Sequence, residues 1–342
     1  MSAIINTRYL YNFKIKDDNE VEFESTNNVA KFLTLDIYKI SESDKRKVYK
    51  GTIDDKKDCV VKVYKKSNGD LYYRIQDLLN DLKNFYKAKD ISSIFSEKFK
   101  NDNDFIKFNY VNFYIGSKDK KDPKALKAFL KDSKNSEISN ELNIIENYIQ
   151  GNFKIFVDEY CEIKYKDFKS IPWFMHWNWV ETNGTYLICD LRGENDLKEF
   201  SLSSPSLQSK DGSYGSSDNG VYSLITFLSE HEHNDHCKNL PWPDDKHIEI
   251  AKSLKNKYSS SKKCDDCEKT YDEIISSAFN SKFNFLNVLI PIVVVIVLCF
   301  ALFFIIKKYK KNKNKNLGEN LNQIENSTSE KEPTGNYWAD ME

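Results

Sequence analysis

The chain has 342 residues, of which 40% are hydrophobic and 14% aromatic, so it is long and apolar enough to form a sizeable hydrophobic core. Its 51 Lys and Arg residues are balanced by 52 Asp and Glu residues, which gives a formal net charge of −1. That balance gives no overall bias toward nucleic acid, so no nucleic-acid partner is predicted.

Two segments in the first half predict regular structure. Residues 59–66, CVVKVYKK, alternate apolar and polar positions as a half-buried strand does, and this strand carries Lys62. A surface lysine is the alternative, because Lys62 is one of many basic residues. Residues 118–134, KDKKDPKALKAFLKDSK, predict an amphipathic, solvated helix, with a disordered insertion as the alternative.

The second half carries a set of metal-binding residue types. His231, His233 and Cys237 form an H-x-H-x3-C cluster, and His176 offers a fourth ligand from earlier in the chain. Four protein ligands leave no open position on zinc, so the predicted metal is structural and does not activate water. The alternative is that the late histidines are solvated residues after the helix-like run at 222–229.

A second pair of cysteines, Cys264 and Cys267, lies in a Lys/Ser-rich stretch that is typical of a linker. This C-x-x-C pair is predicted to be two free thiols. It is also compatible with a redox pair, or with metal ligands that combine with two of the histidines.

Residues 286–306, LNVLIPIVVVIVLCFALFFII, are predicted to form a transmembrane helix. The stretch is about as long as a bilayer crossing requires and contains no charge. A buried core helix is the alternative, but the polar run KKYKKNKNKN that follows argues against it.

Several motifs follow one another in an order that resembles one family. They are SESDKRKVYKG at 41–51, ENYIQGNF at 146–153, MHWNW at 175–179, DLRG at 190–193, YGSSDNG at 214–220 and HEHNDHC at 231–237. Over about residues 41–240 the chain resembles the alpha-kinases, an atypical protein kinase family. The resemblance implies a two-lobed, protein-kinase-like α/β (α+β) domain with a structural zinc in the C-terminal lobe.

The resemblance also implies roles for individual residues. Asp190 would be the catalytic or metal-holding aspartate, Lys62 would neutralise nucleotide phosphates, and Glu146 would lie in the adenine-binding hinge. The implied ATP-binding residues are Lys62, Glu146, Arg46, Gly215, Asp218 and Gly220, and the implied zinc ligands are His176, His231, His233 and Cys237. The implied cofactors are Zn²⁺, together with ATP and Mg²⁺ in an active enzyme, and the implied partner is a protein substrate.

The chain departs from the family pattern at three positions. Ser204 stands where an L-T-D-P turn has its aspartate, Val157 replaces an asparagine, and Ser43 replaces a phosphate-loop glycine. A hydroxyl is a poor base and a weak magnesium ligand. Asp196 or Glu199 is the hypothetical substitute for the missing carboxylate. These departures favour a catalytically inactive pseudokinase as the alternative to an active enzyme.

Charges around the apolar stretch conflict over its orientation. Six lysines follow it, and the positive-inside rule therefore places the tail in the cytosol. The opening residues 1–13 lack the apolar region of a signal peptide, and a need for ATP and reduced zinc ligands favours a cytosolic kinase-like domain. We expect the cytosolic placement. Asn183 is a candidate glycosylation site if the domain is luminal or extracellular.

The sequence thus predicts five parts: an N-terminal extension at 1–40, an alpha-kinase-like domain at 41–250, a linker at 251–285, a transmembrane helix at 286–306 and a disordered tail at 307–342. The predicted function is a single-pass, membrane-anchored serine/threonine kinase that transfers the γ-phosphoryl group of ATP to protein. The alternative is a pseudokinase that acts as a scaffold or binding module. A third hypothesis, a surface antigen or receptor with an unrelated ectodomain, rests on the lysines after the apolar stretch.

Overall fold

The computed structural model describes residues 5–16, 20–33, 39–43, 46–64, 72–132, 142–258, 266–280 and residue 302. Met1–Phe279 forms one compact unit, and Asn280–Glu342 forms a second. Apart from Leu302, the predicted transmembrane stretch at 286–306 and the tail at 307–342 lie outside the described residues. No helix within the described ranges combines the length and the apolar character that a membrane crossing needs.

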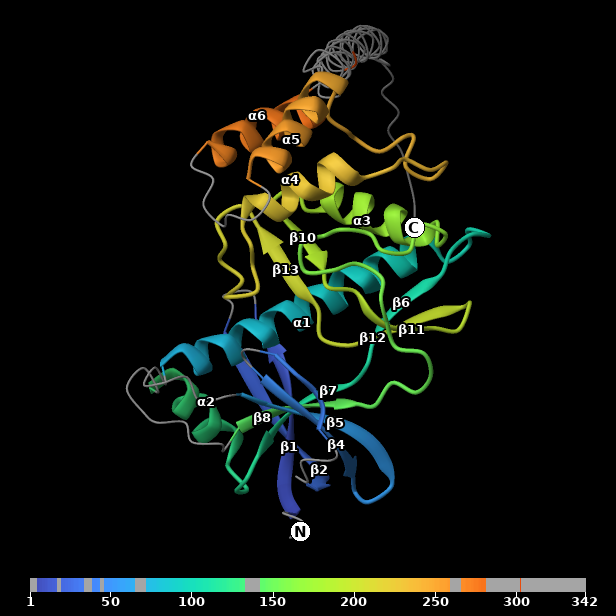
Figure 1. Cartoon of the computed structure of the whole chain (residues 1–342). Helices are drawn as coiled ribbons and strands as arrows, with labels where there is room; N and C mark the ends of the chain where they lie inside the picture. Colours follow the sequence, from blue (N-terminus) through green and yellow to red (C-terminus); the bar gives the residue numbers. More distant parts are fainter. Residues whose placement is uncertain are drawn as a thin grey trace, which may run out of the picture. The chain divides into compact units, whose positions relative to one another are not determined.

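The first lobe is built on a curved, antiparallel, seven-stranded sheet (Figure 1). Its strands in spatial order are β2 (Val21–Leu33), β1 (Ile5–Ile15), β7 (Phe113–Ser117), β8 (Leu142–Asn147), β5 (Lys57–Tyr64), β4 (Arg46–Ile53) and β3 (Lys39–Glu42). β2 also pairs with β4, which curls the sheet back on itself. The strand predicted around Lys62 is β5. Residues 5–33, expected to belong to an extension, supply β1 and β2.

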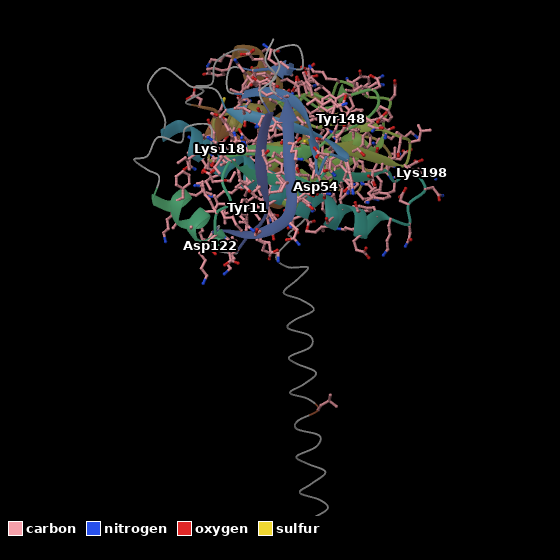
Figure 2. All side chains as sticks on the ribbon, turned by 90° about the horizontal axis from the view of Figure 1, so that it is seen from below. Tyr11, Asp54, Lys118, Asp122, Tyr148 and Lys198 are labelled. Atoms are coloured by element: carbon pink, nitrogen blue, oxygen red, sulfur yellow. A yellow bond between two sulfur atoms is a disulfide. The ribbon has the colours of Figure 1, made fainter. Side chains whose placement is uncertain are left out.

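Two helices pack against this sheet. In α1 (Tyr72–Phe99), Phe85 stacks on Phe113 of β7 with ring centroids 4.5 Å apart. The amphipathic helix predicted near residue 123 is confirmed as α2 (Pro123–Asp132), which begins where Asp122 Oδ1 accepts the Lys124 N–H at 2.8 Å. Figure 2 labels Tyr11 and Asp122, and the Tyr11 hydroxyl donates to the Lys121 carbonyl at 2.8 Å, which ties β1 to the start of α2.

The second lobe combines two small sheets with four helices. One sheet has the order β6 (Lys107–Tyr110), β12 (Glu199–Leu202), β11 (Arg192–Asn195) and β9 (Lys154–Ile155), and the other pairs β10 (Tyr186–Cys189) with β13 (Ser206–Ser209). The helices are α3 (Ser170–Glu181), α4 (Val221–Glu230), α5 (Asp245–Lys257) and α6 (Cys267–Asn280). In Figure 1, α1 runs between the large sheet and this lobe.

The core of the second lobe is aromatic. Ten consecutive residues of α3, from Ser170 to Trp179, are buried, so this helix is enclosed on all sides and packs deep in the lobe. Phe95 of α1 contacts Trp173, Phe174 and Trp177 of α3, with ring centroids 5.1 to 5.2 Å apart. This packing fixes α3, and therefore His176, relative to α1.

Candidate functional site

A buried cluster of four polar side chains joins the two lobes. Lys62 on β5 donates to Glu146 Oε1 on the neighbouring strand β8 at 2.6 Å. Directly after β12, the Ser203 and Ser204 hydroxyls each accept a hydrogen bond from Lys62, at 3.1 and 2.9 Å. The Ser203 hydroxyl donates to Glu146 Oε2 at 2.7 Å, and Ser204 donates to Glu146 Oε1. All four residues are at most 9% exposed, so the second lobe docks on the sheet through hydrogen bonds to an ion pair.

The charges in this cluster have opposing influences. Burial acts to raise the pKa of Glu146, but the Lys62 ammonium and the hydroxyls of Ser204 and Ser203 outweigh burial, and the pKa of Glu146 is lowered. Burial lowers the pKa of Lys62 despite the opposing charge of Glu146. The carboxylate expected in an adenine-binding hinge is thus the counter-ion of Lys62.

Arg46, also expected at the nucleotide, lies near this cluster and pairs with a residue that sequence patterns did not single out. Its guanidinium is 2.8 Å from Asp81 Oδ2 on α1, and the Tyr64 hydroxyl donates to the same oxygen at 2.5 Å. The charges of Asp81, Glu146 and Asp190 all raise the pKa of Arg46. A small pocket lies beside this pair, lined among others by Asp77, Asn80, Tyr214 and Ser216.

Asp190 occupies the turn between β10 and β11. Its backbone is left-handed, with φ of 57°, and its N–H donates to the Asp158 carbonyl at 3.1 Å. Its carboxylate Oδ1 accepts from Arg192 Nε at 2.6 Å and also from Arg192 Nη2. Burial raises the pKa of Asp190, and Arg192 opposes that rise. The DLRG turn therefore holds its aspartate and its arginine together as a pair.

A disulfide bond holds the end of β10, directly before this turn. Cys161 and Cys189 are bonded, with Cα atoms 5.2 Å apart, and both residues are at most 1% exposed. The pairing was not predicted, because the two residues are 28 positions apart and no local pattern links them. Cys267 is also disulfide-bonded, so the prediction that it is a free thiol is wrong.

In the glycine-containing loop at 214–220, the expected site residues hold the conformation of the loop itself. Gly215 has φ of 102°, and a Cβ there would lie 2.5 Å from Asn80 Nδ2 of α1. The Asp218 carboxylate accepts the N–H groups of Ser209, Tyr214 and Gly220 at 2.9 to 3.1 Å, so it holds the loop from inside. Gly220, with φ of 67°, is the N-cap of α4. The site residues expected from this loop thus set its conformation.

Asp196 and Glu199, the hypothetical substitutes for the missing carboxylate, bond residues outside the Lys62 cluster. Asp196 is exposed and its Oδ1 accepts the N–H groups of Lys198 and Glu199, at 3.0 and 2.8 Å. The Glu199 carboxylate bonds Lys107 at 3.1 Å and Asn109 at 2.8 Å. Neither interaction reaches the Lys62 cluster. Val157, the third departure, is fully buried and pairs with Ile163 in an isolated bridge.

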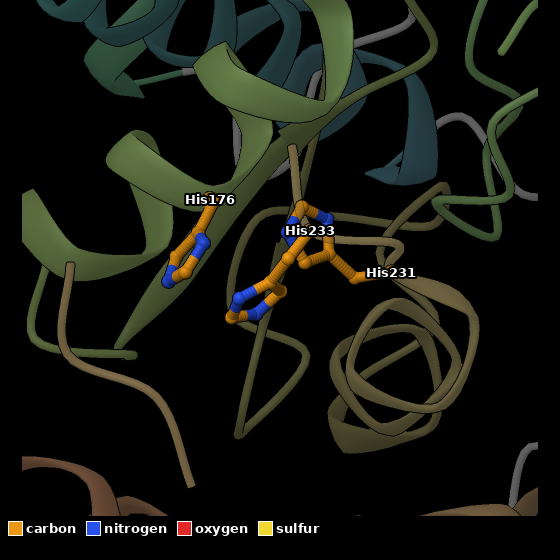
Figure 3. Close-up of side chains that lie close together, drawn as sticks. All are labelled: His176, His231 and His233. Atoms are coloured by element: carbon orange, nitrogen blue, oxygen red, sulfur yellow. The ribbon is translucent and has the colours of Figure 1, made fainter. Parts of the chain in front are cut away.

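Three of the four expected zinc ligands come together. His176 from α3, and His231 and His233 from the segment after α4, have ring nitrogens within 4.8 Å of one another (Figure 3). Trp242 packs on all three rings, with centroids 4.6 to 4.9 Å away. Cys237 is buried, burial raises its thiol pKa, and it falls outside this group of ligand atoms.

The chemistry of the three histidines fits a metal site. Burial lowers the pKa of His231 well below its usual range, and His176 and His233 lower it further, so the ring is neutral. Within the described part of the chain, neither ring nitrogen of His231 has a hydrogen-bond partner. A buried, neutral imidazole without partners, beside two more imidazoles, fits a zinc ligand.

A large antiparallel sheet with a buried lysine–glutamate pair, docked on a second lobe that carries an aspartate turn and a glycine loop, defines a two-lobed kinase fold. The chain belongs to the alpha-kinase family, whose model matches residues 41–237, more than half of the chain.

The relatives agree on the class. Alpha-protein kinase vwkA of Dictyostelium discoideum is 29% identical over 98 residues, which is 28% of this chain and 16% of that protein. This chain therefore matches only a small part of that relative. Among solved structures, an alpha-kinase of Entamoeba histolytica superposes with a TM-score of 0.53 at 18% identity, covering 69% of this chain and 90% of that one. The apoenzyme alpha-kinase domain of myosin-II heavy chain kinase A gives 0.52 at 16% identity, covering 69% and 96%. The mixed α/β fold is shared.

Proposed function

We propose that this chain is a protein kinase of alpha type that binds ATP between its lobes and transfers the γ-phosphoryl group to serine or threonine of a protein. The observation that carries the proposal is the buried Lys62–Glu146 pair, which lies on the sheet and faces the lobe that holds the Asp190 turn. Family membership supports ATP and a protein as the two substrates.

The proposed roles follow from charge and position. Phosphoryl transfer depends mainly on positioning and on neutralising the phosphates. Lys62, oriented by Glu146, and Arg46, oriented by Asp81, supply positive charge. Asp190 is the carboxylate in a position to orient the acceptor hydroxyl. Alpha-kinases, as kinases, use Mg²⁺ with ATP, but two of the site's carboxylates are already held by cations, Glu146 by Lys62 and Asp190 by Arg192. They do not fit a divalent cation as they stand.

A second candidate function is nucleotide binding without transfer, which would make the chain a binding module. It is favoured by Ser204, which replaces a carboxylate and whose hydroxyl is committed to Glu146 and Lys62. General acid–base catalysis typically contributes about 10²–10⁴-fold, so its loss predicts at best a slow kinase.

The two candidates are separated by phosphate transfer from radiolabelled ATP with Mg²⁺ to a general protein acceptor. We expect slow incorporation by the full chain that falls to background in Asp190→Asn, because the acceptor hydroxyl then lacks its carboxylate. Asp196→Asn is the matched control, since Asp196 caps only a surface turn, and should transfer normally. Absence of transfer from folded chain that still binds ATP would favour the second candidate.

We further propose that His176, His231 and His233 hold one structural zinc, with Cys237 as candidate fourth ligand. The support is the group of three ring nitrogens within 4.8 Å of one another, in which both ring nitrogens of His231 are buried and lack a partner among the described residues. Closed four-ligand zinc sites stabilise a fold and leave no position for water. Here the zinc would tie α3 to the segment that follows α4.

Elemental analysis of the purified chain tests the zinc proposal. We expect about one zinc per chain, as in a single four-ligand site. It should be lost from the His231→Ala, His233→Ala double variant. His247→Ala is the control, because His247 bonds Asp244 at the start of α5, away from the cluster. Folded protein without zinc, or a double variant that keeps it, would refute the site.

We also propose that residues 286–306 anchor the chain in a membrane, on the strength of their uncharged, apolar sequence. Disulfides persist in oxidising compartments, so Cys161–Cys189 favours a kinase domain on the luminal or extracellular side, with the following lysines in the cytosol. The disulfide thus supports the orientation opposite to the one expected from the need for ATP.

A further inference from the structure

The interaction of Arg192 with Asp190 is the most distinctive electrostatic feature of the site. Arg192 follows Asp190 by two residues, and two of its nitrogens bond the same carboxylate oxygen, Nε at 2.6 Å. Its Nη2 also lies 3.7 Å from Glu159 Oε2. The guanidinium therefore bridges two carboxylates across the turn, and it stays positively charged because arginine does not deprotonate in proteins.

The backbone holds this arginine in place. The Arg192 carbonyl accepts the Ser203 N–H at 3.0 Å, which connects it to the segment that bonds Lys62. At the next residue, Gly193, a Cβ would lie 1.9 Å from the Ser201 carbonyl oxygen, so the strand pairing there is close. The disulfide at Cys189 anchors the other side of the turn. These contacts fix the backbone of the turn, so the two side chains start from positions that allow them to pair.

Arg192 occupies the Asp190 carboxylate, which a metal ion at this turn would need as a ligand. Mg²⁺ in a kinase is held by one or two carboxylates and by the nucleotide phosphates, and it neutralises their charge. To reach Asp190, a divalent cation would have to displace a charged, doubly bonded guanidinium. The same guanidinium adds a permanent positive charge at Asp190, a carboxylate on which the charge of Arg46 also acts.

We propose that Arg192 replaces a divalent cation at Asp190, so that the chain binds a metal-free nucleoside triphosphate. The nucleotide part of this inference rests on the proposed function. The exclusion of metal from Asp190 does not, because it concerns only the chain's own residues.

The first experiment measures ATP affinity by calorimetry on the full chain, with and without Mg²⁺. Divalent cations are removed from buffers with a chelating resin before protein is added, so that the proposed zinc is left in place. For the unmodified chain we expect the two affinities to agree within about two-fold. For Arg192→Gln we expect binding about ten-fold weaker without Mg²⁺, roughly the effect of losing one charge-assisted contact, and restored with it.

Two further variants control this experiment. Arg192→Lys keeps the charge and should keep metal-independent binding, which guards against a glutamine variant that does not fold. Lys164→Gln removes a nearby exposed cation that pairs with Asp158 and Glu162, and it should behave as the unmodified chain does. An unmodified chain that loses ten-fold or more in ATP affinity when Mg²⁺ is removed would overturn the proposal.

The second experiment needs no nucleotide. Mn²⁺ is titrated into each protein and followed by electron paramagnetic resonance. Arg192→Gln should gain one Mn²⁺ site that the unmodified chain lacks, and adding Asp190→Asn should remove it, which distinguishes this site from the histidine cluster. If Arg192→Gln gains no site, Arg192 is not what excludes the metal and the inference is wrong. If it gains the site but no variant binds ATP under any condition, the proposed function fails while the assignment of Arg192 stands.

Discussion

Replacing Lys62 with methionine should lower the free energy of unfolding by about 3–5 kcal/mol, the usual cost of removing one partner from a buried ion pair. Glu146, only 2% exposed, would keep a charge without its counter-ion. Chemical denaturation of the purified chain measures the loss. The double variant Lys62→Met, Glu146→Leu should recover much of it, because neither buried charge then remains.

The matched control is Lys50→Met. Lys50 pairs with Asp58 on the same two strands at 2.9 Å, but the two side chains are 44% and 39% exposed. Solvent screens such a pair, so its loss should cost far less than the loss of Lys62. Similar costs for the two variants would show that Lys62 and Glu146 are not a buried pair.

The pH dependence of stability tests the Lys62–Glu146 pairing independently. The pKa of Glu146 is lowered below 4.5, so its ionisation stabilises the folded chain above about that pH and the benefit is lost as pH falls through the folded value. In Lys62→Met, burial without the ammonium should instead raise the pKa of Glu146. The deficit of the variant should therefore shrink as the pH is lowered. A deficit that stays constant through this range would contradict the pairing.

Removing the disulfide is the second change with a large expected effect. The Cys161→Ala, Cys189→Ala double variant should lose about 3–4 kcal/mol, because the bond closes a loop of 28 residues in the unfolded chain. It should also weaken ATP binding, since Asp190 directly follows Cys189. A reducing agent should lower the stability of the unmodified chain by more than that of the double variant, which keeps only the disulfide of Cys267.

Peptide mapping without reduction shows directly whether the bond exists in protein taken from cells. We expect the Cys161 and Cys189 peptides to be joined, and a glycan on Asn183, whose side chain is exposed. Free thiols at both positions together with an unmodified Asn183 would place the domain in a reducing compartment and contradict this prediction.

The sequence allowed the kinase fold, the strand of Lys62 and the gathering of His176, His231 and His233 to be predicted, because each depends on a local pattern in a recognisable order. The same patterns did not reveal the partners of the key side chains. Glu146 bonds Lys62 from 84 positions away, and Ser203 and Ser204, which bond both, lie more than 140 positions from Lys62. Such pairings depend on how the strands and lobes pack, so only the folded structure shows them.

The N-terminal strands β1 and β2 determine where a recombinant fragment of this protein can begin. The family match begins at residue 41, yet β1 lies between β2 and β7 in the large sheet, and β2 pairs with β4. A recombinant fragment trimmed to the matched region would lose both strands and leave β7 with an unpaired, apolar edge, which is a template for aggregation. The limits of the family match are therefore not the limits of the folding unit, and fragments for study should begin before β1.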